Sequence, residues 1–307
     1  MNTQAIYISR FCNICGNEGE FVRPEAGREG FICSNCSASS RLRAVMYVLG
    51  RCLRMGDVPV AGWAPDKRLR ILESSGRSSY PMMLKDKFEY YNTEFNPDSE
   101  LVDKPFSRFA DFQNLAYDDE QFDFVIATDV FEHIREDEKA FREMFRVLKH
   151  NGTFIMTVPY NHEWEKTLVR VKTEGDADIF LLPPEYHGGG GQTLAYRTYG
   201  RDLPDRLHAQ GFSVGYLDLE VPKHRIVRQA VFIGTKGSSI DVGKFHIVNE
   251  EDAEGSPLKV SPLVLFRLFV VAKYNLVSVR HFASEVVRKF TDRFQKPSKR
   301  SKKETHW

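Results

Sequence analysis

The chain has 307 residues, of which 42% are hydrophobic, 28% charged and 12% aromatic, as is ordinary for a soluble globular protein with a large core. Its length suits one sizeable α/β domain with smaller attachments. The net charge of +1 gives no reason to expect a polyanionic partner for the chain as a whole. We see no secretory signal and no window of about 18 uncharged apolar residues, so we expect a cytoplasmic protein without a spanning helix.

Two Cys-x-x-Cys pairs stand near the N-terminus, separated by 17 residues. They comprise Cys12, Cys15, Cys33 and Cys36. Each pair can turn tightly enough to place two sulfurs about one tetrahedron edge apart, and the spacing is typical of a four-thiolate zinc site. We predict a zinc ribbon over residues 1–40 whose Zn²⁺ is structural, because four thiolates leave no position for water. Free buried thiols and redox dithiols are the alternatives.

Residues 41–67 are predicted to form a helix followed by a linker. Either Ser39 or Ser40 suits the N-cap, and apolar residues then recur at helical spacing. These are Leu42, Val45, Met46 and Leu49. Cys52 lies on the same helix and is expected to pack rather than to bind metal. Two glycines and two prolines within residues 55–67 favour a linker.

From residue 68 onward, short apolar runs alternate with helical segments, which predicts a doubly wound, mostly parallel α/β sheet over residues 68–240. The predicted strands are 68–74, 88–94, 106–111, 122–128, 152–159, 212–220 and 229–236. The predicted helices are 78–87, 136–150 and 199–210, with Asn151–Gly152 ending the second. Residues 160–195 are expected to be irregular. The last two strands are close enough in sequence to be antiparallel neighbours.

Acidic residues stand at four successive strand ends of this pattern: Glu73, Glu94, Asp111 and Asp129. In an open parallel sheet, ligands bind at the carboxyl ends of the strands, near the point where the strand order reverses. Glu94 follows Glu73 by 21 residues, the offset at which an acid can accept hydrogen bonds from ribose hydroxyls. The acids therefore indicate a nucleoside-type ligand at this edge.

Residues 68–235 resemble the class I S-adenosylmethionine-dependent methyltransferases, in particular the type 11 subgroup, which implies a Rossmann-like fold. The most specific part is "FDFVIATDVFEHIREDEKAFREMFRVLKHNGTFIMTVP". "YYNTEFNPDS" is similar to the motif that would place Glu94 and the adjoining Phe95 at the ribose. "FADFQNL" is similar to the motif in which Asp111 meets the adenine amine and Phe112 flanks its ring. Asp129 would lie beside the methionine part of S-adenosylmethionine.

The first loop departs from the family pattern. Where the family has an acid followed by three alternating glycines, this chain reads "ESSGRSS" from Glu73, with Gly76 as the only glycine. Small residues such as Ser75 still let the backbone approach a ligand. The resemblance implies that Glu73, Ser75 and Gly76 bind the cofactor, and the departure leaves open a non-catalytic, methyltransferase-like binding protein.

Methyl transfer to oxygen needs positioning and, for many acceptors, a base. His133, His187 and Asp129 are the candidate catalytic residues, with His162 ranking below them. His133 could instead cap or pack the following helix. The run from Asp129 to His133 is also similar to the acidic-His motif that binds a divalent ion in ubiquinone-pathway O-methyltransferases.

The acceptor is expected to be an oxygen of a sugar or another small molecule. The tract "PPEYHGG…LAYRTYGRDLPDRLHAQGF" resembles members that act in bacterial surface-polysaccharide biosynthesis. The alternative is an RNA methyltransferase that uses the ribbon region and the C-terminal tail to hold RNA; the ribbon region offers Arg10, Arg23, Arg28, Arg41 and Arg43. Nucleic acid is disfavoured because no basic cluster with interleaved aromatics is present, and neither "DPPY" nor "NPPY" follows the fourth strand.

Residues 257–307 are predicted to form an amphipathic helix and a basic tail. Eight basic and two acidic residues lie between Arg288 and Trp307. Such a helix could make peripheral contact with an anionic membrane surface. The alternative is packing on the domain or on a second subunit.

Overall fold

The fold is described from a computed structural model of the chain, for residues 10–24, 29–74, 80–95, 108–187 and 193–237. The chain divides into two compact units, Met1–Ile247 and Val248–Trp307, and every described residue belongs to the first. The predicted amphipathic tail at 257–307 therefore lies outside the described residues. Among the helices of the described ranges, none is long and apolar enough to cross a membrane.

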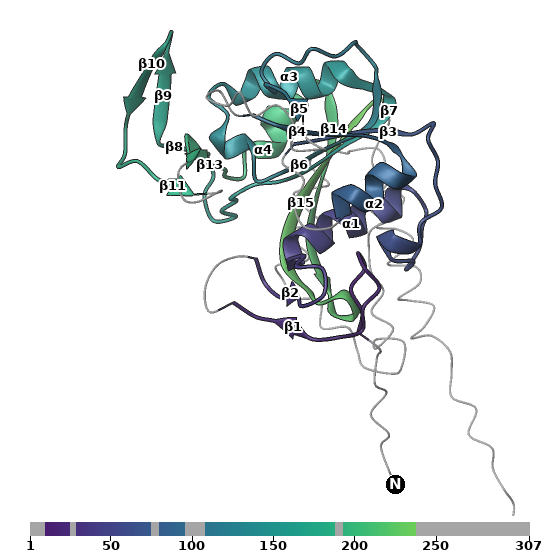
Figure 1. The fold of residues 1–307 in the computed structure, drawn as a ribbon. Coiled ribbons are helices and arrows are strands. Elements are labelled where there is room, and N and C mark those ends of the chain that lie inside the picture. The colour runs from purple at the N-terminus through teal and green to yellow at the C-terminus, as the bar shows by residue number, and fades with distance from the viewer. Residues whose placement is uncertain (1–9, 25–28, 75–79, 96–107, 188–192, 238–307) are drawn as a thin grey trace, which may run out of the picture. The chain divides into compact units, whose positions relative to one another are not determined.

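A seven-stranded sheet forms the centre of this unit (Figure 1). Its strands, in spatial order, are β14 (Phe212–Val221), β15 (Ile226–Lys236), β7 (Leu148–Thr157), β6 (Phe122–Thr128), β3 (Arg70–Ser74), β4 (Glu89–Glu94) and β5 (Arg108–Phe109). Neighbours from β5 to β7 run parallel, whereas β15 is antiparallel to both β7 and β14. The predicted mostly parallel sheet with an antiparallel last strand is confirmed. The strand order reverses between β3 and β6.

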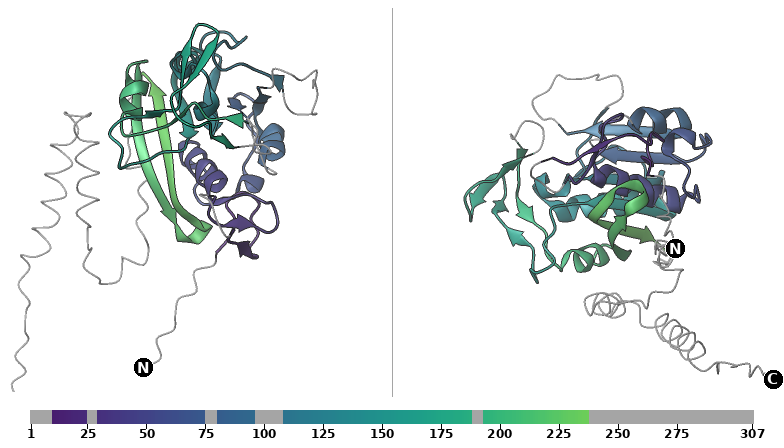
Figure 2. Two further views of the ribbon diagram at one scale, coloured as in Figure 1. Left: turned by 90° about the vertical axis from the view of Figure 1, so that its left-hand side faces the viewer. Right: turned by 90° about the horizontal axis from the view of Figure 1, so that it is seen from below.

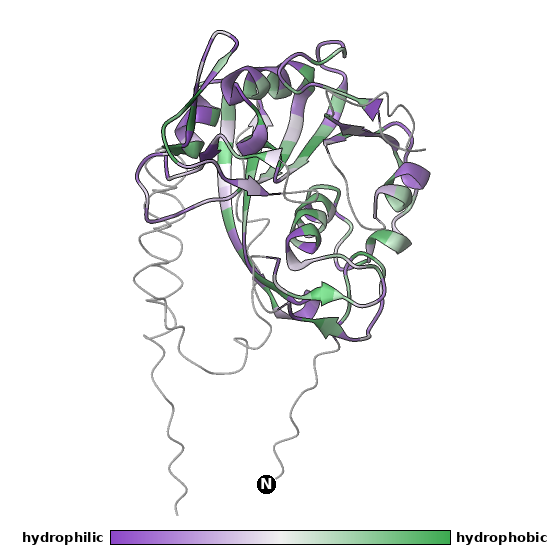
Figure 3. Cartoon of the chain, turned by 60° about the vertical axis from the view of Figure 1, so that its left-hand side comes forward, coloured by the Kyte–Doolittle hydropathy of each residue, from purple (hydrophilic) through white to green (hydrophobic). Residues whose placement is uncertain are grey.

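Successive side chains of the central strands point to opposite faces of the sheet and belong to two hydrophobic clusters, one on each face. Ile71, Phe124 and Ile155 belong to the first cluster together with residues of α1 (Ser40–Cys52) and α2 (Tyr80–Lys87). Their sequence neighbours Leu72, Val125, Phe154 and Met156 belong to the second, with α3 (Asp137–Val147) and α4 (Leu203–His208). Both faces are thus covered by helices, and hydrophobic residues concentrate there, while outer loops are hydrophilic (Figure 3).

The N-terminal ribbon region packs on the turn of the long β14–β15 hairpin (Figures 1 and 2). Its strands β1 (Phe21–Val22) and β2 (Ile32–Cys33) pair antiparallel. The amide of Phe11 donates to the oxygen of Lys223 over 3.1 Å, and Ser40 Oγ donates to the oxygen of Arg225 over 2.7 Å. Lys223 belongs to the short helix η3 (Pro222–His224) in that turn. The ribbon region and the sheet therefore share one hydrophobic cluster.

Helix α1 begins as predicted, with the Ser39 side chain accepting from the amide of Leu42. The segment predicted as a linker, 55–67, is mostly exposed, and two of its side chains are buried. It contains the short helix η1 (Val60–Gly62) and buries Val60 and Trp63 in the first cluster. These two buried side chains anchor a segment that is otherwise mostly exposed, as expected of a linker.

The predicted end of the helix at 136–150 is wrong. Helix α3 stops at Val147, and Leu148 is already in β7, fully buried and paired with Phe122. Asn151 does adopt the left-handed backbone conformation expected of a helix terminator, with φ of +65°, but within the strand. Pairing of Leu148 with the neighbouring strand replaces the last helical turn.

Residues 160–195 are more regular than predicted. They contain β8 (Leu168–Val169), β9 (Val171–Glu174), β10 (Ala177–Phe180), β11 (Tyr186–His187) and β12 (Thr193–Leu194), and β13 (Arg197–Thr198) follows. β9 and β10 form a hairpin that stands out from the sheet (Figure 1), with Gly175 at φ of +57° in its turn. β11 pairs with β12, and β13 with β8.

Candidate functional site

The carboxyl ends of the parallel strands lie at one edge of the sheet, as their registers show. Ser74 is paired with Thr93, Glu94 with Phe109, and Thr128 with Thr157. The structure therefore brings the four predicted strand-end acids to the same edge, where an open α/β sheet binds its ligand. The predicted cofactor residues Ser75 and Gly76 lie outside the described residues.

Glu73 is fully buried at the end of β3. Its two carboxylate oxygens accept hydrogen bonds from the hydroxyls of Tyr80, at the start of α2, and Tyr90, the latter over 2.5 Å. Burial raises the pKa of Glu73 to about 7, although both tyrosine donors oppose the shift. A direct contact between Glu73 and a cofactor would have to compete with these two hydrogen bonds.

The adjacent strand ends present both exposed and buried aromatic rings. Phe95, next to Glu94, is 54% exposed, and its ring centroid lies 5.8 Å from that of Phe109. Asp111 accepts a hydrogen bond from the amide of Gln113 over 2.8 Å, forming a tight turn. Phe112 is only 3% exposed and belongs to the second cluster. The predicted contacts of these residues with adenine and ribose stay predictions.

Asp129 directly follows β6 with φ of +52°, a conformation that Asp tolerates better than most residues. Thr157 Oγ1 donates to Asp129 Oδ1 over 2.9 Å, and the Asp129 amide donates to the Thr157 oxygen over 3.0 Å. Asp129 Oδ2 forms an ion pair with Nη1 of Arg41, in the first turn of α1. Glu29 accepts from Nε of the same guanidinium over 3.3 Å and from Nη2. The N-terminal region thus places an arginine at the edge of the sheet where the strand-end acids lie.

His133 ends the short helix η2 (Phe131–His133) that follows β6. Its Nδ1 lies 2.8 Å from the oxygen of Leu194. A carbonyl oxygen only accepts, so Nδ1 carries the proton and Nε2 is the basic nitrogen of the neutral ring. The His187 ring centroid lies 4.6 Å away, and Oε1 of buried Glu132 lies 3.7 Å from Nε2.

The structure therefore brings together two of the predicted catalytic histidines. His162, which ranked below them, is exposed. Glu132, His133 and His187 each offer one donor atom within 4.8 Å of the others, so they could also hold a divalent cation. A base and a cation ligand are thus the two roles that this group of side chains can fill.

The segment that carries His133 is held by Arg197 of β13 and by Tyr196, the residue before that strand. Arg197 is 6% exposed and donates to the main-chain oxygens of Phe131, over 3.0 Å, and Arg135, over 2.8 Å. The amide of Tyr196 donates to the Glu132 oxygen over 2.8 Å. Sequence reasoning missed both Arg41 and Arg197 as parts of this site, and no local pattern identifies either one.

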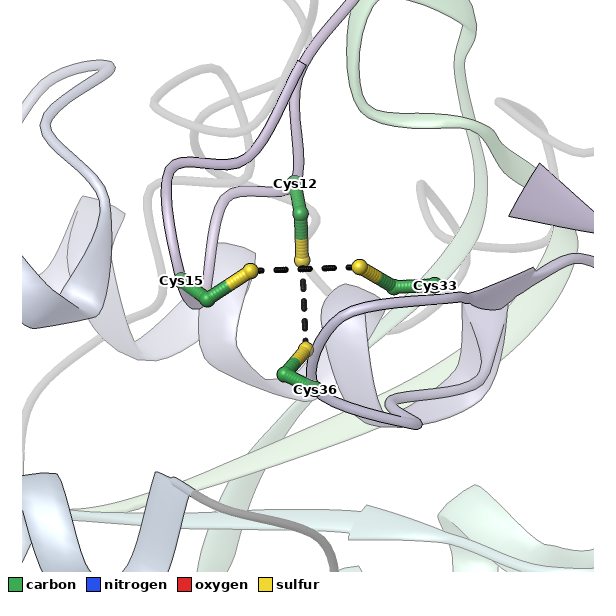
Figure 4. A group of neighbouring side chains, drawn as sticks. All are labelled: Cys12, Cys15, Cys33 and Cys36. Carbon is green, nitrogen blue, oxygen red and sulfur yellow. Dashed lines mark hydrogen bonds between the residues drawn. The ribbon is translucent and has the colours of Figure 1, made fainter. Parts of the chain in front are cut away.

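The four predicted zinc ligands converge, and their sulfurs point toward one another (Figure 4). Cys12 Sγ lies 3.7 Å from Cys36 Sγ, and Cys15 Sγ lies 3.8 Å from Cys33 Sγ. A tetrahedral zinc with Zn–S bonds of about 2.3 Å has edges of roughly 3.8 Å, so this group fits the metal. Cys52 lies outside the group and packs against the first cluster, as predicted.

Residues 74–156 match the family model described as "Methyltransferase domain". This stretch runs from the end of β3 into β7, so it contains the strand ends of β4, β5 and β6. The chain therefore carries a segment that matches a methyltransferase domain, as its sequence predicted. No curated protein shows significant sequence similarity to the chain.

Several solved structures are similar to the chain at low identity. One belongs to a complex between the Haloferax volcanii Trm112 methyltransferase activator and a methyltransferase, with 15% identity over 64% of this chain and 93% of that chain, and a TM-score of 0.38. YcgJ from Bacillus subtilis has 11% identity over 63% and 100% of the two chains, with a TM-score of 0.37. An S-adenosylmethionine-dependent methyltransferase from Mesorhizobium loti has 11% identity over 64% and 98%, with a TM-score of 0.40.

Proposed function

We propose that the enzyme methylates an oxygen of a sugar or another small molecule, with His133 as the general base. The observation that carries this proposal is the bond between His133 Nδ1 and the Leu194 oxygen. It leaves Nε2 as the basic nitrogen directly after β6, at the edge where the donor is expected to bind. A base placed there suits a hydroxyl acceptor, whose proton must leave as the new bond forms.

S-adenosylmethionine supplies an electrophilic methyl group, so the protein's main task is to position donor and acceptor. We assign Glu94 to the ribose hydroxyls, Asp111 to the adenine amine, and Asp129 to the ammonium of the methionine part. Phe95 is exposed beside Glu94, so it offers a ring face for stacking. Glu73 is assigned an indirect role, because its carboxylate is already held by Tyr80, which follows the first loop, and by Tyr90 of β4.

The cysteine group is proposed to hold structural Zn²⁺. Four thiolates would fill all four positions of a tetrahedral ion, which leaves none for water or substrate. The first cluster contains Cys12, Cys33 and Cys36 alongside residues of the sheet. The metal would therefore stabilise the methyltransferase domain as well as the ribbon.

The RNA alternative is weakened at two of the five ribbon arginines, Arg41 and Arg43, whereas Arg10 and Arg23 are exposed. Arg43 is fully buried and binds main-chain oxygens, and the Arg41 side chain is 14% exposed and paired with two acids. Neither side chain is therefore presented to a phosphate backbone. Direct phosphate contacts by exposed lysines and arginines are what nucleic-acid affinity requires.

Titration calorimetry with S-adenosylmethionine and S-adenosylhomocysteine tests the cofactor assignment. We expect binding by the wild-type chain and loss of binding by Glu94→Ala, with Glu89→Ala, an exposed residue of the same strand, as the control. Lack of binding by the wild type at millimolar ligand would favour the non-catalytic alternative. Incubation of small-molecule and glycan extracts with isotopically labelled donor, read by mass spectrometry, would identify the acceptor.

A further inference from the structure

Arg41 lies at the edge of the sheet where the amino-acid part of the methyl donor is expected to bind. It comes from α1, well before the segment that matches the methyltransferase model, yet its guanidinium contacts Asp129 across 88 residues of sequence. Its side chain is 14% exposed and that of Asp129 is 15% exposed. The pair is therefore largely shielded from solvent but still accessible at the edge of the sheet.

Glu29 holds this guanidinium in a fixed orientation. It accepts from Nε over 3.3 Å and from Nη2, so both of these donors are directed at one carboxylate. Nη1, on the opposite side, is directed at Asp129. The backbone supports this arrangement, because the Ser40 amide donates to the Glu29 oxygen over 2.9 Å. One side of Arg41 is thus anchored, while the other faces the candidate site.

We infer that Arg41 binds the carboxylate of the methionine part of S-adenosylmethionine, while Asp129 binds its ammonium. This inference rests on the proposed function, which places the methionine part beside Asp129. A ligand that carries one positive and one negative group can exchange with the Arg41–Asp129 ion pair without leaving an uncompensated charge. Uncompensated charges in a shielded site are costly, so a zwitterion is the ligand chemistry that suits this pair.

The inference gives the N-terminal region a role in cofactor binding. Arg41 follows Cys36 by five residues, and Glu29 precedes Cys33 by four. The methyltransferase domain alone would lack both residues. The site for the donor is therefore incomplete without the four-cysteine region.

The test compares three ligands on the full-length chain: S-adenosylhomocysteine, its analogue with a carboxamide in place of the carboxylate, and 5′-methylthioadenosine, which lacks the amino-acid part. We expect Arg41→Gln to weaken binding of S-adenosylhomocysteine by about 10- to 100-fold. Binding of 5′-methylthioadenosine should change by less than about threefold. The wild type should prefer the carboxylate to the carboxamide, and Arg41→Gln should lose most of that preference.

Arg68→Gln serves as the control, because Arg68 is 90% exposed and paired only locally with Asp66. Melting temperature and zinc content establish that each variant is folded. If Arg41→Gln fails to fold, Arg41→Lys takes its place and should retain part of the carboxylate preference, since it keeps the charge but not the fork of donors.

Equal weakening of all three ligands, or no weakening of any, would overturn the assignment of Arg41. Those outcomes differ from a failure of the proposed function itself, in which the wild type would bind none of the three ligands.

Discussion

Arg43 Nε donates a hydrogen bond to the main-chain oxygen of His224 over 2.9 Å, which ties α1 to the turn of the β14–β15 hairpin. The same guanidinium donates from Nη2 to the oxygens of Phe31 and Arg225, each over 2.9 Å, and from Nη1 to that of Ala38. Arg43 is fully buried, and burial lowers the pKa of its guanidinium, while the four nearby cysteines oppose that shift. A zinc with four thiolates carries a net charge of about −2, so Arg43 would neutralise part of it.

Replacing Arg43 by Met should therefore destabilise both the hairpin and the metal centre. We expect the free energy of unfolding to fall by about 3–5 kcal/mol, because several buried carbonyls lose their donor and the thiolates lose a counter-charge. Zinc should also dissociate more readily in a competition assay with a chelating dye. Arg51→Met is the matched control, since Arg51 is on the same helix but bonds only to the Tyr47 hydroxyl through its guanidinium. Equal stability of the two variants would contradict the role of Arg43.

Zinc removal should affect the whole described unit rather than the ribbon alone. Cys33→Ser, or treatment with a strong chelator, is expected to lower the free energy of unfolding by several kcal/mol, at least about 5. The reason is that Cys33 belongs to the cluster that also contains Phe124 and Leu217 of the sheet. Far-ultraviolet circular dichroism during thermal unfolding measures the effect, and elemental analysis counts the metal.

Cys52→Ser provides the comparison, because Cys52 packs on the same cluster without joining the four sulfurs. It should retain one zinc per chain. Independent melting of a zinc-free ribbon, with the sheet transition unchanged, would show that the two parts are not coupled.

The features predicted from sequence are those with a local signal. Cys-x-x-Cys spacing located the four-cysteine group, and the helical spacing of Leu42, Val45, Met46 and Leu49 located buried positions of α1. The acids fell at one edge because short parallel strands between helices leave their carboxyl ends together. Each of these inferences needs only spacing along the chain.

The features that were missed depend on contacts between distant residues. Arg43 and His224 are 181 residues apart, and the separation of Arg41 from Asp129 leaves no periodicity that links them. Both arginines were considered only as possible contacts to RNA. The short strands between 168 and 194 were missed because two to four residues cannot establish an alternating pattern.

The raised pKa of Glu73 predicts that stability declines with pH between about 4.5 and 7. In the unfolded chain the Glu73 carboxyl has its ordinary pKa of 4.5 and has released its proton in this window. In the folded protein its pKa is about 7, so it still holds that proton. Unfolding is therefore favoured as pH rises, and the contribution present below 4.5 is lost above 7, on the order of 3 kcal/mol. Desolvation of the carboxylate is the cause, only partly offset by the tyrosine hydroxyls.

Glu73→Gln removes this titration. The difference in melting temperature between the variant and the wild type should shift in favour of the variant from pH 5 to pH 8. Exposed Glu89→Gln should show no such shift. A difference that stays constant with pH would mean that the carboxyl group ionises equally easily in the folded and unfolded chain.

His133→Gln should lower kcat by about 10²- to 10⁴-fold if Nε2 removes the acceptor proton. The Kd for S-adenosylmethionine should stay within about twofold, because the substitution changes the acceptor side of the site. His162→Gln is the control at an exposed position, and His187→Gln should have a smaller effect, since His187 contacts the His133 ring without sharing its bond to Leu194. Added Mg²⁺ distinguishes the two roles open to these side chains. If His133 acts as a base, the rate should not depend on added Mg²⁺. If instead the wild-type rate requires Mg²⁺ and both histidine variants lose that dependence, His133, His187 and Glu132 form a metal site and His133 is not the base.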